Sequence, residues 1–102
     1  MMWHTHPMFP YIEFTYCGKA RYKKSGREIK LHSSGHGGYS VIFRDLTVVM
    51  RICPVVILSA GRFFGNAYFG TPLRGGDFKV YRRDPDKMYH IENLEVRKNA
   101  SV

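Results

Sequence analysis

The sequence has few acidic residues and no long apolar stretch. Of its 102 residues, eight are Asp or Glu and sixteen are Lys or Arg, which gives a formal charge of +8. That excess indicates an anionic partner, either nucleic acid or an anionic membrane surface. The longest apolar stretch, around residues 52–58, is far shorter than the roughly 20 residues of a membrane-spanning helix. The start of the chain shows neither a signal segment nor an intact transit peptide. We therefore expect no membrane partner.

Cysteine is also scarce, and the histidines lack metal-ligand spacing. The two cysteines lie in different segments without a CxxC pattern, which indicates buried thiols in a reducing compartment. His4 lies close to His6, and His32 lies four residues before His36. Neither pair has a cysteine or carboxylate at a recognised spacing, so we predict surface or RNA-facing imidazoles and no metal.

Motifs for catalysis and phosphate binding are absent as well. Ser59 follows an apolar run but is not part of GxSxG, and no histidine is placed to serve it. Asp45 is a candidate helix cap and Asp77 follows Gly-Gly, so the two aspartates are a poor acid–base pair. Neither GxxxxGK[ST] nor a strand followed by GxGxxG occurs. The sequence therefore predicts no enzyme, no cofactor and no small-molecule substrate.

Short strands dominate the pattern that is present. Alternating or β-branched stretches bounded by glycine and proline are typical of strands. They predict strands at Tyr11–Tyr16, Arg27–His32, Tyr39–Phe43, Val55–Ser59 and Asp77–Arg82.

One short helix and several irregular segments complete the expected organisation. Helical spacing of apolar residues after the candidate cap Asp45 predicts a helix at Arg44–Arg51. Residues 1–10 resemble a loose, proline-punctuated leader, residues 60–76 a glycine-rich loop, and residues 83–102 an irregular surface extension. Connections this short do not allow parallel crossovers. The prediction is a single α+β domain with mainly antiparallel strands.

A dense basic run is the strongest functional signal. Six Lys or Arg residues lie between Lys19 and Lys30, against Glu28 alone. Such a run is often only a solvated face, but here the whole chain is basic and Tyr22 lies inside the run. Clustered cations neutralise phosphates and release counterions, whereas insertion into a membrane surface needs an apolar helical face that the run lacks. We therefore predict nucleic-acid binding, through a basic hairpin or a charged loop.

The segment 57–77, ILSAGRFFGNAYFGTPLRGGD, adds rings and flexible backbone. Its glycines allow backbone N–H groups to approach a phosphate or sugar closely. Its four aromatic rings either fill the core or stack on splayed bases, and we assign at least two to the core.

The chain resembles a known family from Ser33 onward. The run SSGHGGYSVIFRDLTVVMRICPVVILS, residues 33–59, resembles the carboxy-terminal domain of small-subunit ribosomal protein eight. There, a turn with Ser, Pro and Gly precedes a strand, a Lys-Asp-Leu helix start, a glycine-rich break and a strand ending in Ile-Leu-Ser. Gly75-Gly76-Asp77 matches the family's Gly-Gly-Glu before the last strand. The family's Thr-Ser is replaced by Ala60-Gly61, which removes two hydroxyl donors.

The resemblance covers residues 11–82 and implies an rRNA-binding domain. It implies a structural constituent of the small ribosomal subunit that binds small-subunit rRNA beside neighbouring ribosomal proteins. Because the family's amino-terminal domain is missing and a tail is added, we expect a mitochondrial ribosome rather than a plastid or bacterial one. The expected RNA-binding residues combine the basic run with the matched loop: Lys19, Arg21, Lys23, Lys24, Arg27, Lys30, Ser33, Ser59, Gly61, Arg62, Arg74, Gly75 and Gly76.

Two alternatives remain open. The stretch KLHSSGH, residues 30–36, is similar to a turn in large-subunit ribosomal protein six, although that alignment needs more gaps and leaves Gly75-Gly76 unexplained. A basic accessory subunit of a membrane-bound respiratory complex would also carry a net positive surface.

Overall fold

Nine short strands and one α-helix make up the part of the chain that the structure describes. The structure is a computed structural model and describes residues 2–33, 35, 38–48 and 54–98. All strand pairs are antiparallel, so the predicted α+β class with mainly antiparallel strands is confirmed. The elements are β1 His4–Thr5, β2 Ile12–Phe14, β3 Ala20–Tyr22, β4 Glu28–Ile29, β5 Leu31–Ser33, β6 Tyr39–Arg44, β7 Val55–Ser59, α1 Ala60–Phe69, β8 Phe78–Arg82, the 3-10 turn η1 Ile91–Asn93 and β9 Leu94–Lys98.

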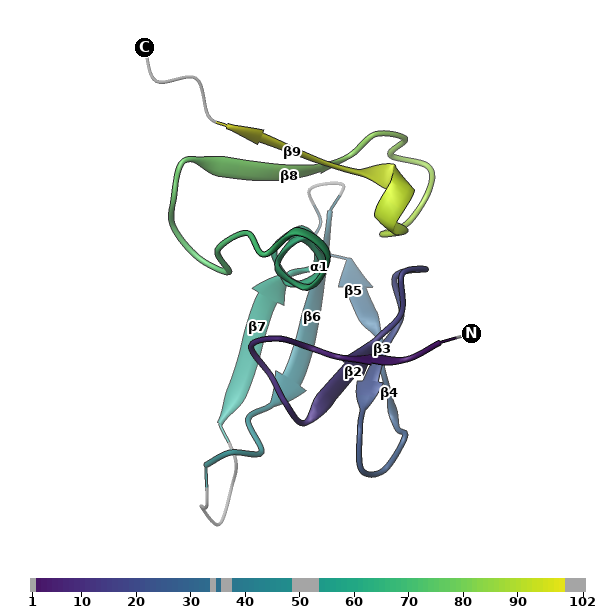
Figure 1. The fold of residues 1–102 in the computed structure, drawn as a ribbon, viewed down its shortest axis with the longest axis vertical. Helices are drawn as coiled ribbons and strands as arrows, with labels where there is room; N and C mark the ends of the chain where they lie inside the picture. The colour runs from purple at the N-terminus through teal and green to yellow at the C-terminus, as the bar shows by residue number, and fades with distance from the viewer. Residues whose placement is uncertain (1, 34, 36–37, 49–53, 99–102) are drawn as a thin grey trace.

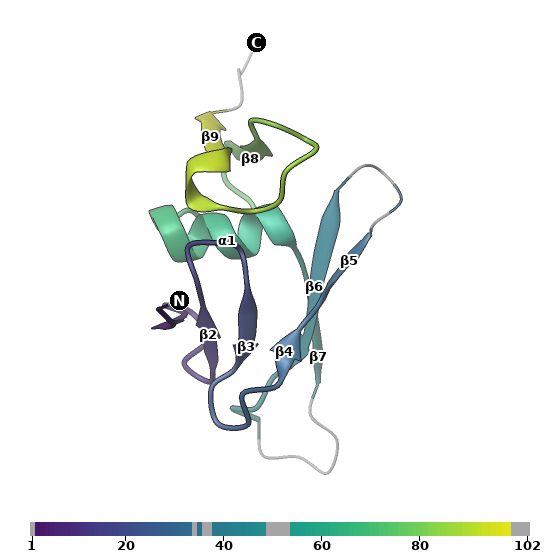
Figure 2. The same cartoon turned by 90° about the vertical axis from the view of Figure 1, so that its right-hand side faces the viewer.

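The strands form three sheets that meet around α1. The first sheet has the order β1-β2-β3-β4, the second β5-β6-β7, and the third is the ribbon β8-β9. The chain passes between the first two sheets at Lys30, because Ile29 pairs with Ala20 and Leu31 pairs with Val41. Figure 2 shows the two sheets splayed apart below α1, with the ribbon above it. The four-stranded and three-stranded sheets therefore share one continuous edge segment.

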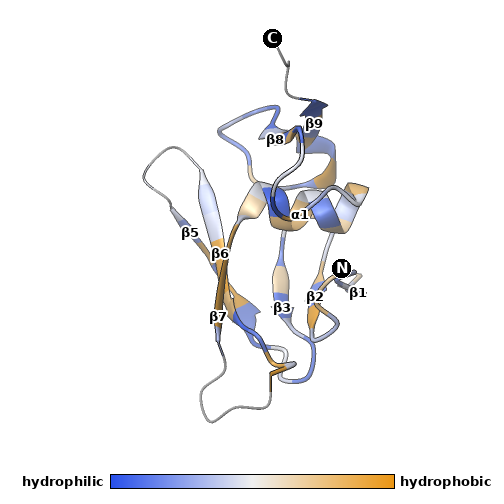
Figure 3. Cartoon of the chain, turned by 90° about the vertical axis from the view of Figure 1, so that its left-hand side faces the viewer, coloured by the Kyte–Doolittle hydropathy of each residue, from blue (hydrophilic) through white to orange (hydrophobic). Residues whose placement is uncertain are grey.

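The core lies where these sheets face the helix. Phe63 and Phe64 on α1 are fully buried, and Phe43 on β6 is 2% exposed. They pack with Ile12 and Val41, which are also fully buried. Figure 3 shows that hydrophobic residues gather along β2, β6 and β7, whereas β9 is mostly hydrophilic. Burial of these large side chains is the main stabilising contribution, at about 1.5–3 kcal/mol each.

The predicted glycine-rich loop is wrong over its first part, because residues 60–69 form α1. The buried positions Ala60, Phe63 and Phe64 have helical spacing. Gly65 faces β8, and a Cβ there would lie 2.9 Å from Val80 Cγ2. The helix ends at Gly70, whose φ of 74° is left-handed. The glycines thus provide close packing and a helix end rather than flexibility.

The predicted helix at residues 44–51 is also wrong where the structure describes it. Arg44 is the last residue of β6, and a turn follows. The side chain of Asp45 accepts hydrogen bonds from the backbone N–H and hydroxyl of Thr47. These bonds hold the pKa of Asp45 below its usual range. Asp45 therefore closes a local turn instead of capping a helix; residues 49–51 lie outside the described ranges.

The first ten residues are not a loose leader. Strand β1 pairs with β2, and His6 is 1% exposed. The His6 ring nitrogen Nε2 lies 3.1 Å from the carbonyl oxygen of Phe63 on α1. The prolines that interrupt this segment therefore shape a packed strand and turn.

The expected irregular surface extension is likewise corrected over residues 83–98. Strand β9 pairs with β8 along its whole length, and Tyr89 and Leu94 are 4% and 2% exposed. The Tyr68 hydroxyl on α1 lies 2.8 Å from the carbonyl oxygen of Tyr89 and 2.9 Å from that of Thr15. This single hydroxyl connects α1 to the segment after β2 and to the segment before η1.

Candidate nucleic-acid interface

A groove lies between the β3–β4 turn and the ends of β6 and β7 that point away from α1. It encloses about 920 Å³. Basic side chains from three segments line it, and apolar side chains form its floor. The basic residues are Lys24, Arg27, Lys30, His32 and Arg44, and the apolar ones include Ile42, Leu46 and Val55.

The turn that carries Lys24 and Arg27 is a tight hairpin, which is one of the two forms expected for the basic run. Gly26 has a φ of 72°, and its N–H donates to the carbonyl of Tyr22 at 2.8 Å. The Ser25 hydroxyl accepts from the N–H of Arg27 at 3.2 Å. These bonds fix the backbone and leave both basic side chains exposed.

The floor is the outward face of the β6–β7 sheet, and the β3–β4 turn lies across the groove from it. In the β6–β7 register, Ile42 pairs with Ile57 and Arg44 with Val55. Strand side chains alternate between faces, so Val41 and Phe43 point to the core and these residues point outward. Ile42, Leu46 and Val55 are 38%, 48% and 52% exposed. An apolar floor under a basic rim suits a ligand with both flat apolar surfaces and anionic groups.

Little acid offsets the positive charge of the groove. Glu28 is the one carboxylate among its described lining residues. The ion pairs formed between described residues are Arg21–Glu13 and Arg97–Glu95. Neither involves the Lys24, Arg27 or Lys30 side chains, which are exposed. These three cations therefore remain available to an anionic ligand.

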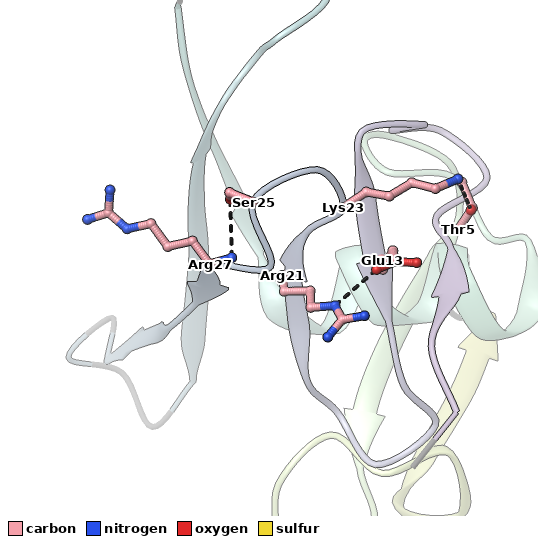
Figure 4. Close-up of polar contacts among 6 residues, drawn as sticks. All are labelled: Thr5, Glu13, Arg21, Lys23, Ser25 and Arg27. Carbon is pink, nitrogen blue, oxygen red and sulfur yellow. Dashed lines mark hydrogen bonds and ion pairs between the residues drawn. The ribbon is translucent and has the colours of Figure 1, made fainter.

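Two residues of the predicted basic set point elsewhere. Arg21 Nε donates to Glu13 Oε1 at 2.9 Å, and its guanidinium lies 3.9 Å from the ring centroid of Trp3. Lys23 Nζ donates to the Thr5 hydroxyl at 3.0 Å. Figure 4 shows both side chains turned toward β1 and β2, whereas the Arg27 guanidinium extends away from them. The basic run therefore divides into a structural half and a groove half.

Lys19 and Ser33 also lie apart from the groove. Lys19 precedes β3 while Lys24 follows it, so the two lie at opposite ends of the strand. Ser33 is the last residue of β5, and its hydroxyl accepts from the N–H of Gly35 at 3.5 Å. Both are exposed, but neither lines the groove.

The remaining predicted arginines, Arg62 and Arg74, bind backbone carbonyl oxygens of this chain. Arg62 donates through Nη1 to the carbonyl oxygens of Pro72 and Gly75 at 3.2 and 2.7 Å. Its Nη2 donates to the carbonyl of Phe78 at 3.0 Å. Arg74 donates to the carbonyl of Ile57 at 3.3 Å. Both arginines therefore bind backbone of this chain and hold the loop in place.

The small residues of this predicted set have separate positions. Ser59 ends β7 and is exposed, and its side chain makes no cap hydrogen bond to α1. Gly61 is buried, and a Cβ on it would lie 3.2 Å from the Val80 carbonyl oxygen. Gly75 and Gly76 are exposed with φ of 69° and 75°. Glycine is needed there because other residues rarely adopt positive φ.

Sequence reasoning missed the groove residues His32, Ile42, Arg44, Leu46 and Val55. A signal was present, because strict alternation from Tyr39 onward places Ile42 and Arg44 on one face. What the sequence did not indicate is that the β3–β4 turn folds over that face.

Within the described ranges, no three His, Cys, Asp or Glu side chains come together as metal ligands. Within the same ranges, no helix is both long and apolar enough to cross a membrane. Comparison with family models, curated proteins and solved structures finds no match to this chain.

Proposed function

We propose that the protein binds structured RNA, as an rRNA-binding structural constituent of a mitochondrial-type small ribosomal subunit. The groove between the β3–β4 turn and the β6–β7 sheet is the proposed contact surface. The observation that carries the proposal is the set of three exposed cations, Lys24, Arg27 and Lys30, without ion pairs among the described residues. The ribosomal part draws on the family resemblance of residues 11–82.

The chemistry of the groove fits a folded RNA strand. Lysine and arginine on the rim neutralise phosphates and release counterions, which supplies affinity without sequence preference. The exposed Ile42 and Val55 side chains offer apolar contact to the sugars that line the minor groove. A-form RNA presents a wide, shallow minor groove that proteins recognise by shape, 2′-hydroxyls and phosphates. A hydrogen-bonded hairpin that carries exposed cations suits that kind of recognition.

Charge-reversal variants test the location of the contact. We expect K24E/R27E to weaken binding to a small-subunit rRNA fragment about tenfold or more and to lower the salt slope by about two. The control K19E/K87E makes the same change in net charge at exposed positions outside the groove, so its affinity should stay close to that of the wild type. Fluorescence anisotropy across a salt series measures both quantities. An equal loss in both variants would show that net charge alone, and not the groove, determines binding.

Sedimentation tests the ribosomal part. We expect a tagged full-length chain to sediment with the small subunit when a mitochondrial lysate is separated on a gradient. Ribonuclease treatment should release the chain from that fraction. Migration with the large subunit would support the alternative ribosomal family instead. Migration with a membrane complex would overturn both ribosomal assignments.

A further inference from the structure

The β8–β9 ribbon is a second basic surface, far from the groove. The molecule extends 46 Å along its longest axis. Figure 1, which has that axis vertical, shows the ribbon above α1 and the ends of β6 and β7 that line the groove below it. Figure 2 shows the same separation from the side. The two surfaces therefore lie toward opposite ends of the molecule.

The ribbon has one face toward the helix and one toward solvent. Val80 pairs with Val96, and a Cβ on Gly65 of α1 would lie 2.9 Å from Val80 Cγ2. The alternate pairs Lys79–Arg97 and Tyr81–Glu95 consequently point away from the helix. Arg83, the residue after β8, is exposed and borders the same hollow as Tyr81 and Arg97. Side chains of the ribbon thus alternate between a face that packs on α1 and a basic face that points to solvent.

An exposed ring lies among the outward cations. Tyr81 is 42% exposed, and the Arg97 guanidinium lies 5.5 Å from its ring centroid. Arg97 Nη2 also donates to Glu95 at 3.1 Å, and this pair raises the pKa of Arg97. Tyr81, Arg83, Glu95 and Arg97 border a hollow of about 560 Å³. The ring is therefore held beside cations in a shallow surface recess.

This combination matches the chemistry of an unpaired nucleotide. Bases stack on exposed aromatic rings in single-stranded RNA recognition, and neighbouring Lys and Arg bind the phosphates. An acidic peptide would use the cations but would leave the exposed ring unused. This surface carries three cations, Lys79, Arg83 and Arg97, and one carboxylate, Glu95.

We infer that the outward face of the ribbon binds unpaired nucleotides, so that one chain bridges two RNA segments. A duplex region occupies the groove, and a single-stranded region occupies the ribbon. The inference rests on the proposed function for the groove and adds a second ligand class at a separate place.

The test uses the full-length protein with two labelled RNAs: a short duplex carrying a donor dye and an oligouridine carrying an acceptor. Wild-type protein should bring the two into energy transfer. Y81A should bind the oligouridine about tenfold more weakly and lose the transfer, while its affinity for the duplex stays unchanged. Y81F, which keeps the ring, should behave as the wild type.

The groove variant separates the two proposals. K24E/R27E is expected to lose the duplex and to keep the oligouridine. If Y81A bound oligouridine as tightly as the wild type while the duplex still bound the groove, the ribbon inference would be overturned and the proposed function would stand. If the wild-type protein bound neither RNA, the proposed function itself would fail.

Discussion

The buried imidazole of His6 contacts the carbonyl oxygen of Phe63 at 3.1 Å, and the two rings stack with their centroids 4.4 Å apart. On the other side of the ring, Nδ1 accepts from the N–H of Met8 at 3.1 Å. Nε2 therefore carries the proton of the neutral ring and donates to Phe63. Protonation of the ring would remove the acceptor that Met8 needs. Burial of the ring, which disfavours its charged form, is the main cause that lowers the pKa of His6.

This contact predicts that mild acid destabilises the fold. The unfolded chain binds a proton at His6 near pH 6.5, whereas the folded chain binds it only at lower pH. The contribution to stability is therefore complete above the unfolded pKa and is lost as the pH falls through the folded pKa. Urea unfolding monitored by circular dichroism at several pH values measures the change in free energy of unfolding.

A variant without the titrating ring is the matched test. H6F keeps an aromatic side chain against Phe63 but lacks both hydrogen bonds, so we expect about 1–2 kcal/mol less stability at neutral pH. Its free energy of unfolding should also change less between neutral and mildly acidic pH. H32Q, which removes an exposed imidazole instead of the buried one, is the control for loss of a histidine. An identical acid response in H6F and the wild type would contradict the assignment to His6.

Strands β6 and β7 were accessible from the sequence because each combines β-branched residues with a local break, whereas the predicted strand Arg27–His32 divides at Lys30 into β4 and β5. Tyr39–Phe43 and Val55–Ser59 lie within or coincide with β6 and β7. Their alternation alone determines which side chains point to the core. For the basic run Lys19–Lys30 the sequence left a hairpin and a charged loop open, and the structure shows the hairpin, which turns at Ser25-Gly26.

Helix α1 and the last strand were not accessible in the same way. Glycine lowers helix propensity by about 1 kcal/mol relative to alanine, so Gly61 and Gly65 favour a loop in the sequence. In the structure both glycines lie against Val80 of β8, and this close contact explains why they occur in a helix. Strand β9 is mostly charged, and only Leu94 within it is buried. Both elements depend on contacts between segments distant in the sequence. The groove was missed for that reason too, since it forms only when the β3–β4 turn faces β6.

Replacing Gly65 with a residue that carries even one methyl group should destabilise the fold. A Cβ there would lie 2.9 Å from Val80 Cγ2 and 3.0 Å from Thr71 Oγ1. G65A would gain about 1 kcal/mol of helix propensity but incur about 1–3 kcal/mol of overpacking. We expect a net loss of stability in chemical unfolding, because β8 has to move away from α1.

Removal of the opposing side chain tests that explanation. V80A removes the two methyl groups nearest to the new Cβ. The free energy of unfolding of G65A/V80A should therefore be higher than the sum of the two single-variant effects predicts. A double-mutant cycle gives the coupling energy, which for contacting residues is about 0.5–3 kcal/mol. Additive effects would show that packing against Val80 is not the reason for glycine at this position.

Arg62 should act as a structural clamp rather than as an RNA contact. Its guanidinium donates to the carbonyl oxygens of Pro72, Gly75 and Phe78, and a lysine ammonium lacks the planar fork that reaches all three. We expect R62K to speed amide hydrogen exchange in residues 72–78, since local opening there becomes easier. Its affinity for the rRNA fragment and its salt slope should match the wild type. R74K is the control. Arg74 lies in the same loop but makes a single hydrogen bond, to the carbonyl of Ile57 on β7, so R74K should change amide exchange less than R62K. Because R62K keeps the positive charge, R62A tests phosphate binding: a salt slope lower by about one in R62A would instead show that Arg62 binds a phosphate.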